Sequence, residues 1–192
     1  FCWVDTLEQL EQQLFKLQPN EFESLAIQIF HQQYTHNSLY RSFCDQLHIR
    51  TADVRHLHEI PFLPISLFKR FQVTTTPFTP ELIFESSRTT GSIPSVHHVK
   101  KAELYQRSFL KGFEHFYGKP EQYSFLALLP SYLERQQSSL VYMVEHLMQH
   151  TPMPCNFYLH NLDALYHQLL ESERNEVPTM LFGVTFALLD FA

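Results

Sequence analysis

Short apolar runs alternate with amphipathic helical patterns along the second half of this 192-residue chain. The sequence predicts strands at residues 82–85, 96–99, 124–129, 155–159 and 179–184, and helices at residues 101–117, 138–150, 162–171 and 185–192. Apolar strands that alternate with helices are typical of parallel pairing, with helices on both faces of the sheet. The alternation therefore predicts an α/β fold with a doubly wound, mainly parallel sheet.

The first sixty residues carry helical periodicity instead. Leucines at steps of three and four residues share one helix face; they are Leu7, Leu10, Leu14 and Leu17. Asn20 followed by Glu23 fits a capping pair for a second helix. From Ile60 onward, prolines interrupt an apolar stretch, which indicates an extended, packed segment because proline lacks the amide hydrogen that helices need. We expect a helical region at residues 1–59 and an α/β core at residues 60–192.

Composition excludes several classes of protein. Hydrophobic residues make up 44% of the chain, which excludes a disordered protein. The 4 glycines are about a third of average usage, which excludes phosphate-binding loops built from several glycines. The formal net charge of −6 disfavours binding to a nucleic-acid backbone, because such binding requires a basic face.

The cysteines and the apolar runs bear on the compartment. Cys2, Cys44 and Cys155 are odd in number and far apart, so neither a disulfide framework nor a zinc site is predicted. A reducing, cytoplasmic location is the simplest expectation. No apolar run approaches the length of about 20 residues that a bilayer requires, so no membrane span is expected.

Twelve histidines invite a search for a metal site. None of their clusters has the spacing typical of metal ligands, so we expect surface or capping histidines and no metal centre; the clusters are His56 with His58, the pair His97 and His98, and His146 with His150. A serine-hydrolase elbow and the common nucleotide-binding glycine motifs are also absent from the sequence. Three carboxylates fit either acid–base or Mg²⁺-binding groups or ordinary solvated side chains; they are Glu59, Glu81 and Glu85.

A hydroxyl-rich segment follows the first predicted strand. Seven of the twelve residues at positions 84–95 are Ser, Thr or Gly. Hydroxyls and free backbone amides in a turn form an anion-binding concavity, and Gly91 supplies a position where φ can be positive. An ordinary polar turn has the same composition, so composition alone leaves both interpretations open.

This segment resembles the Ser-Ser-Gly-Thr-Thr-Gly phosphate-binding motif of adenylate-forming enzymes, the acyl- and aryl-CoA ligase superfamily. Three further blocks, at residues 60–69, 128–143 and 182–190, resemble the bacterial acyl-protein synthetase branch, which is related to the ligase LuxE and to phenylacetate-CoA ligase. The four blocks occur in the order that the family shows. The resemblance runs from about Leu7 to the last residue.

The resemblance implies that ATP, with Mg²⁺, reacts with a carboxylic acid such as a fatty acid to give an acyl-adenylate and pyrophosphate. The acyl group then passes to the thiol of a protein cysteine or of CoA. It also implies two sets of binding residues, although no catalytic residue is assigned. The nucleotide phosphates would lie against Ser86, Ser87, Arg88, Thr89, Thr90 and Gly91. The acyl or adenylate group would lie against Pro130, Ser131, Tyr132, Glu134, Gly183, Val184 and Thr185.

Two departures from the family pattern bear on activity. Arg88 stands where the motif has glycine, so its side chain either obstructs the phosphate site or pairs with a phosphate. The sequence stops before the family's later adenine-site and lid motifs, so we expect an incomplete core that is inactive on its own. Cys155 opens a predicted strand and is expected to be a core residue. The alternative is a non-catalytic member of the family that acts by binding a partner.

Overall fold

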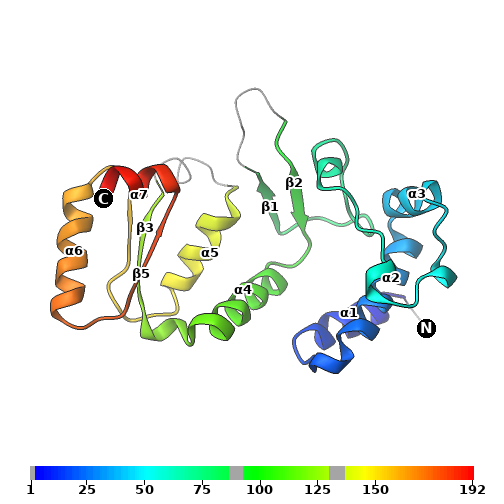
Figure 1. Cartoon of the computed structure of the whole chain (residues 1–192), viewed down its shortest axis with the longest axis horizontal. Coiled ribbons are helices and arrows are strands. Elements are labelled where there is room, and N and C mark those ends of the chain that lie inside the picture. Colours follow the sequence, from blue (N-terminus) through cyan, green and yellow to red (C-terminus); the bar gives the residue numbers. More distant parts are fainter. Residues whose placement is uncertain (1–2, 87–92, 130–136) are drawn as a thin grey trace. The chain divides into compact units, whose positions relative to one another are not determined.

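The computed structural model describes residues 3–86, 93–129 and 137–192 (Figure 1). The chain forms two compact units. One comprises Phe1–Ile83 and Arg88–Lys101, and the other comprises Phe84–Ser87 and Ala102–Ala192. Among the described residues, no helix is both long enough and apolar enough to cross a membrane.

Helices form most of the first unit. Its α-helices are α1 (Trp3–Leu14), α2 (Phe22–His36) and α3 (Ser38–Gln46). Its short 3₁₀ helices are η1 (Pro19–Glu21), η2 (Thr51–Asp53), η3 (Leu57–Glu59) and η4 (Ile65–Lys69). One apolar core joins α2 and α3 to the proline-rich segment that follows them. Its members are Phe30, Tyr40, Cys44 and Val54, with Ile60 and Leu63 packed against them.

The start of α2 differs from the sequence-based expectation. The N-cap of α2 is Glu21, with no side-chain cap hydrogen bond, so the predicted capping pair of Asn20 and Glu23 is wrong. The carboxylate of Glu23 instead accepts a hydrogen bond from the Leu57 N–H at 3.0 Å. Glu23 therefore connects α2 to η3, a partner that the local sequence does not indicate.

A three-stranded parallel sheet forms the centre of the second unit. β3 (Ser124–Leu128) lies between β4 (Asn156–Tyr158) and β5 (Thr179–Gly183). Both neighbours run parallel to β3. The prediction of parallel strands separated by helices is confirmed for these three strands.

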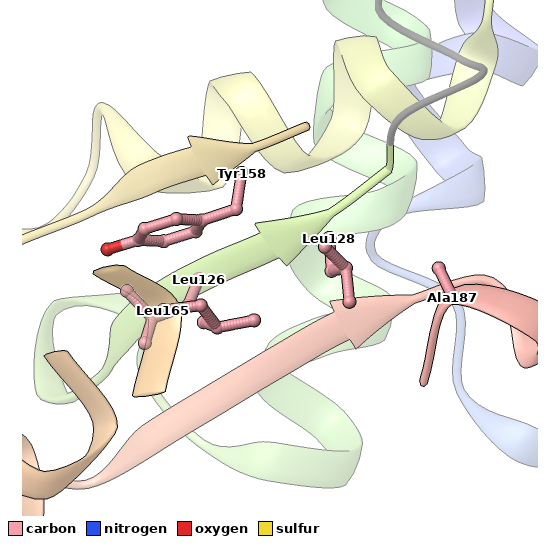
Figure 2. Close-up of a cluster of buried hydrophobic side chains, with 5 residues drawn as sticks. All are labelled: Leu126, Leu128, Tyr158, Leu165 and Ala187. Atoms are coloured by element: carbon pink, nitrogen blue, oxygen red, sulfur yellow. The ribbon is translucent and has the colours of Figure 1, made fainter. Parts of the chain in front are cut away.

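Helices cover both faces of this sheet. They are α4 (Ala102–Tyr117), α5 (Ser139–Met148), α6 (Leu162–Arg174) and α7 (Thr185–Phe191), with η5 (Pro120–Gln122) before β3. Successive side chains of a strand point to opposite faces. Leu126 and Leu128 pack with α6 and α7, as Figure 2 shows, whereas Phe125 and Ala127 pack with α4 and α5. All four side chains are at most 1% exposed, so β3 is the buried centre of a doubly wound core.

The first two predicted strands form a sheet of their own. β1 (Leu82–Glu85) pairs with β2 (Val96–Val99) in a two-stranded sheet that is separate from β3, β4 and β5. The two strands are confirmed, whereas their expected place in the parallel sheet is not. A local pattern predicts a strand but not its partner, because pairing depends on packing against distant residues.

Candidate functional site

The carboxyl ends of the three parallel strands meet at one edge of the sheet. Leu128 lies opposite both Tyr158 and Gly183 in the register, so the segments that begin at positions 129, 159 and 184 leave the sheet together. Open α/β sheets bind ligands at this edge. Gly183 ends β5, Val184 is the N-cap of α7, and Thr185 is the first residue of α7. The structure therefore places these three predicted site residues at the edge where ligands bind in such sheets.

One hydrogen bond ties the end of β1 to this edge. The N–H of Glu85 donates to the carbonyl of Gln137 at 3.0 Å. Gln137 directly precedes Ser138, the N-cap of α5. The first turn of α5 and Val184 pack against the same buried residues, Leu129 among them. The end of β1 therefore lies beside the start of α5, at the carboxyl edge of the parallel sheet.

The structure describes only part of the predicted ligand set. Ser86 directly follows β1 and is exposed. The other predicted phosphate ligands lie outside the described residues; they are Ser87, Arg88, Thr89, Thr90 and Gly91. The same is true of the predicted acyl-site residues Pro130, Ser131, Tyr132 and Glu134. The hydrogen bond joins Glu85, which directly precedes Ser86, to Gln137, which lies three positions after Glu134.

Aromatic side chains hold the end of β1 in the second unit. The ring of Phe84, which is 7% exposed, lies 5.0 Å from that of Tyr105 in α4 and 5.6 Å from that of Tyr142 in α5, between centroids. Gln106 Nε2 donates to Tyr142 Oη at 2.7 Å, and Tyr105 Oη donates to the Ser139 carbonyl at 3.4 Å. Burial raises the pKa of Tyr105, so its hydroxyl stays protonated and can donate. The sequence alone does not indicate this cluster, because nothing local shows that β1, α4 and α5 meet.

Packing explains why position 183 is glycine. A Cβ on Gly183 would lie 2.5 Å from Cδ2 and 2.6 Å from Cγ of Leu188. α7 begins two residues after β5 and turns Leu188 back onto the strand end. The contact accounts for the missing side chain without a ligand. A role for Gly183 in substrate binding remains a prediction.

No group of three or more metal-binding side chains occurs in the part of the chain that the structure describes. The half-buried ring of His146 stacks on that of Tyr142, with centroids 6.3 Å apart. Burial lowers the pKa of His146, and the neighbouring His150 lowers it further. His146 is therefore neutral at pH 7 and supplies no positive charge for a phosphate.

Cys155 lies at the opposite end of the sheet from the candidate site. It directly precedes β4, and its Sγ accepts a hydrogen bond from the Phe125 N–H at 3.2 Å. Burial raises the pKa of the Cys155 thiol, which makes it a poor nucleophile near neutral pH. Its side chain packs against the cluster of Phe113, Phe125 and Leu147, in agreement with its predicted place in the core.

The titratable groups around η3 have structural roles. The Glu59 carboxylate accepts hydrogen bonds from the N–H groups of Arg55 at 2.7 Å and His56 at 2.9 Å, which lowers the pKa of Glu59. His56 Nδ1 lies 3.4 Å from Glu23 Oε1, and its ring stacks on that of His58. Glu59 therefore caps a turn rather than acting as a free acid or base.

Two described cavities, of about 590 and 570 Å³, lie along α2 in the first unit. The first is lined by amide side chains, among them Gln9, Gln12 and Gln28, together with the charged side chains of Lys16 and Glu21.

Comparison of the chain with protein-family models, curated proteins and solved structures gives no match. The family resemblance therefore depends on the four sequence blocks themselves.

Proposed function

We propose that this chain contributes the phosphate- and acid-binding edge of an ATP-dependent acyl-protein synthetase. In that reaction a carboxylate oxygen attacks the α-phosphorus of ATP, the bond to pyrophosphate breaks, and an acyl-adenylate forms. A thiol then attacks the acyl carbonyl and AMP leaves. A fatty acid is the first candidate substrate, and a protein cysteine or CoA is the acceptor. ATP and free thiols both fit a reducing cytoplasm, where we place the protein.

The hydrogen bond between Glu85 and Gln137 carries this proposal. Adenylation requires the triphosphate and the acid at one place, since a reaction between two bound groups depends on their proximity. The segment that resembles the phosphate motif begins at Ser86, directly after Glu85. Gln137 lies within the block at residues 128–143, three positions after the predicted acyl-site residue Glu134. Glu85 and Gln137 are hydrogen-bonded to one another beside the N-terminus of α5. Thr185 adds an exposed residue with a hydroxyl at the same edge of the sheet.

The residues at this edge suit a nucleotide. Hydroxyl and backbone N–H groups are donors, and phosphate oxygens accept from such donors. Mg²⁺ is usually held by substrate phosphates together with one or two carboxylates, so it does not need a dedicated protein cage. The ion would enter with the triphosphate. When bound, it would neutralise phosphate charge.

Titration of ATP against the purified chain, with Mg²⁺ present, tests the proposal. We expect saturable binding that Thr89→Val and Thr90→Val each weaken about tenfold or more, because hydrogen bonds to charged groups contribute about 1.5–3 kcal/mol. Ser42→Ala is the control, since that hydroxyl donates to the Ser38 carbonyl within α3. Equal weakening by all three substitutions would contradict the assigned role of the segment.

A non-catalytic binding protein of the same ancestry is the second candidate, and the arginine at position 88 favours it. If Arg88 obstructs the phosphate site, Arg88→Gly raises ATP affinity; if its guanidinium binds phosphate, the same change weakens binding. We expect obstruction, because the family motif binds phosphate without an arginine there. Carboxylate-dependent exchange of labelled pyrophosphate into ATP, by a protein that joins this chain to the family's adenine-site and lid motifs, would support the enzyme. Failure of both the wild type and Arg88→Gly to bind ATP would refute the nucleotide site altogether.

A further inference from the structure

Three large apolar side chains project into solvent from the proline-rich segment of the first unit. Phe62 is 76% exposed, Ile65 is 81% exposed and Phe71 is 50% exposed. Scattered exposed apolar residues are normal in proteins, whereas apolar side chains that gather in one exposed patch mark an interaction site. This segment includes the block at residues 60–69, which the proposed function does not use.

The fold holds this segment in place while those side chains remain outside. Tyr40 Oη donates to the Pro61 carbonyl at 2.7 Å, and Leu63 packs against the core of the first unit. The ring of Phe68 stacks on that of His97 in β2, with 6.2 Å between centroids. Inward residues thus anchor the segment between the outward ones. The exposure of the outward residues is therefore a feature of the fold.

The charges on this segment are all positive. Lys69 and Arg70 are the only charged residues between positions 60 and 80, and both are exposed. The whole chain carries a formal charge of −6, so the segment is a basic spot on an acidic protein. An anionic surface would be attracted here and repelled by the remainder of the chain. Charge therefore favours an anionic partner and orients the protein with this segment toward it.

The backbone of the segment suits an interface with lipid. Pro61 and Pro64 have no N–H to desolvate. The N–H groups of Leu67, Arg70 and Phe71 bond to carbonyls within the segment at 3.0, 3.0 and 2.9 Å. Unsatisfied backbone groups are the main cost of entering the apolar part of a membrane, and at these five positions no N–H is left unpaired. A bilayer also deforms around projecting side chains, whereas a protein partner must provide a matching pocket.

We propose that residues 61–71 form a docking surface for an anionic lipid bilayer. Phe62 and Ile65 would enter the boundary between headgroups and acyl chains, and Lys69 and Arg70 would lie at the lipid phosphates. The docking is peripheral and does not depend on the proposed enzymatic function.

Vesicle flotation with the purified chain tests this surface. We expect binding to phosphatidylcholine vesicles that contain roughly one third phosphatidylserine, weaker binding to phosphatidylcholine alone, and loss of binding as salt rises. The double variant Phe62→Ser, Ile65→Ser should bind about a hundredfold more weakly, at about tenfold for each buried apolar side chain. Lys69→Gln with Arg70→Gln should weaken binding by about thirtyfold.

A matched control comes from α4, where Phe116 is also 76% exposed. Phe116→Ser removes the same side chain at the same exposure and should leave vesicle binding unchanged. Trp3 is the only tryptophan, so a Trp3→Phe background allows a single probe. Phe62→Trp should then shift its emission to shorter wavelength on the anionic vesicles, and Phe116→Trp should not.

Three results would overturn the proposal. The first is no binding to either kind of vesicle. The second is equal loss of binding in Phe116→Ser and in the double variant, with both still folded by circular dichroism. The third is self-association of the chain that the double variant abolishes while vesicles remain unbound, since that assigns the surface to a second copy.

Discussion

Replacing Gly183 with alanine tests whether contact between β5 and α7 determines the residue at the carboxyl edge of the sheet. The added Cβ would lie 2.5 Å from Cδ2 and 2.6 Å from Cγ of Leu188, whereas carbon atoms in contact normally lie about 3.5–4.0 Å apart. Leu188 is itself packed against the core that contains Leu126 and Leu128. Either this side chain leaves its place in the core or the turn between β5 and α7 shifts.

The size of the effect follows from two positions in the same unit. Overpacking by one methyl group costs about 1–3 kcal/mol, which is the loss expected for Gly183→Ala. At Gly112 in α4 nothing lies within 4 Å of an added Cβ. Alanine in a helix interior is about 1 kcal/mol more stable than glycine, so Gly112→Ala should stabilise the protein. The same chemical change should therefore differ by about 2–4 kcal/mol between the two sites, or about 4–16 °C in Tm.

Thermal unfolding, followed by circular dichroism, measures the stability of Gly183→Ala and Gly112→Ala. The same experiment is done on Leu188→Ala and on the double variant Gly183→Ala, Leu188→Ala. Shortening Leu188 removes the clash, so the double variant should be about 1–2 kcal/mol more stable than the two single losses together predict. If the two losses add, or if Gly183→Ala is as stable as the wild type, the packing argument is wrong. The glycine would then need another explanation, such as a ligand.

Other substitutions address single interactions. Tyr142→Phe removes the acceptor of the Gln106 hydrogen bond and should cost about 1 kcal/mol in urea unfolding; an unchanged midpoint would count against the contact. Backbone N–H groups lower the folded-state pKa of Glu59, so its contribution to stability is complete above the unfolded value near 4.5 and is lost as the pH falls through the folded value. Glu59→Gln should therefore flatten the fall in stability below pH 4.5, and acid-unfolding curves that superimpose would contradict this. Gly118 has φ of 85° at the end of α4, so Gly118→Ala should cost about 1 kcal/mol in thermal unfolding, and Gly118→Asn should cost less; equal losses for the two variants would argue against backbone strain.

The residue pattern by itself determined the strands and helices of the second unit. Predicted bounds differ from those of β3, β4, β5 and the four helices around them by at most three residues. This agreement has a local cause, because the spacing of apolar residues along a few turns or a short strand selects the element. The same pattern indicated that Gly183, Val184 and Thr185 lie at a strand end.

Only the tertiary structure decided which elements meet. The runs Leu82–Glu85 and Thr179–Gly183 are both short and apolar, yet the first pairs in a two-stranded sheet and the second joins the parallel sheet. Packing in the core also decides two contacts. It brings Glu85 beside Gln137, which is distant in the sequence, and it turns α7 so that Leu188 contacts Gly183. Local spacing cannot encode these choices, because their free energies come from burial and pairing with residues far away in the sequence.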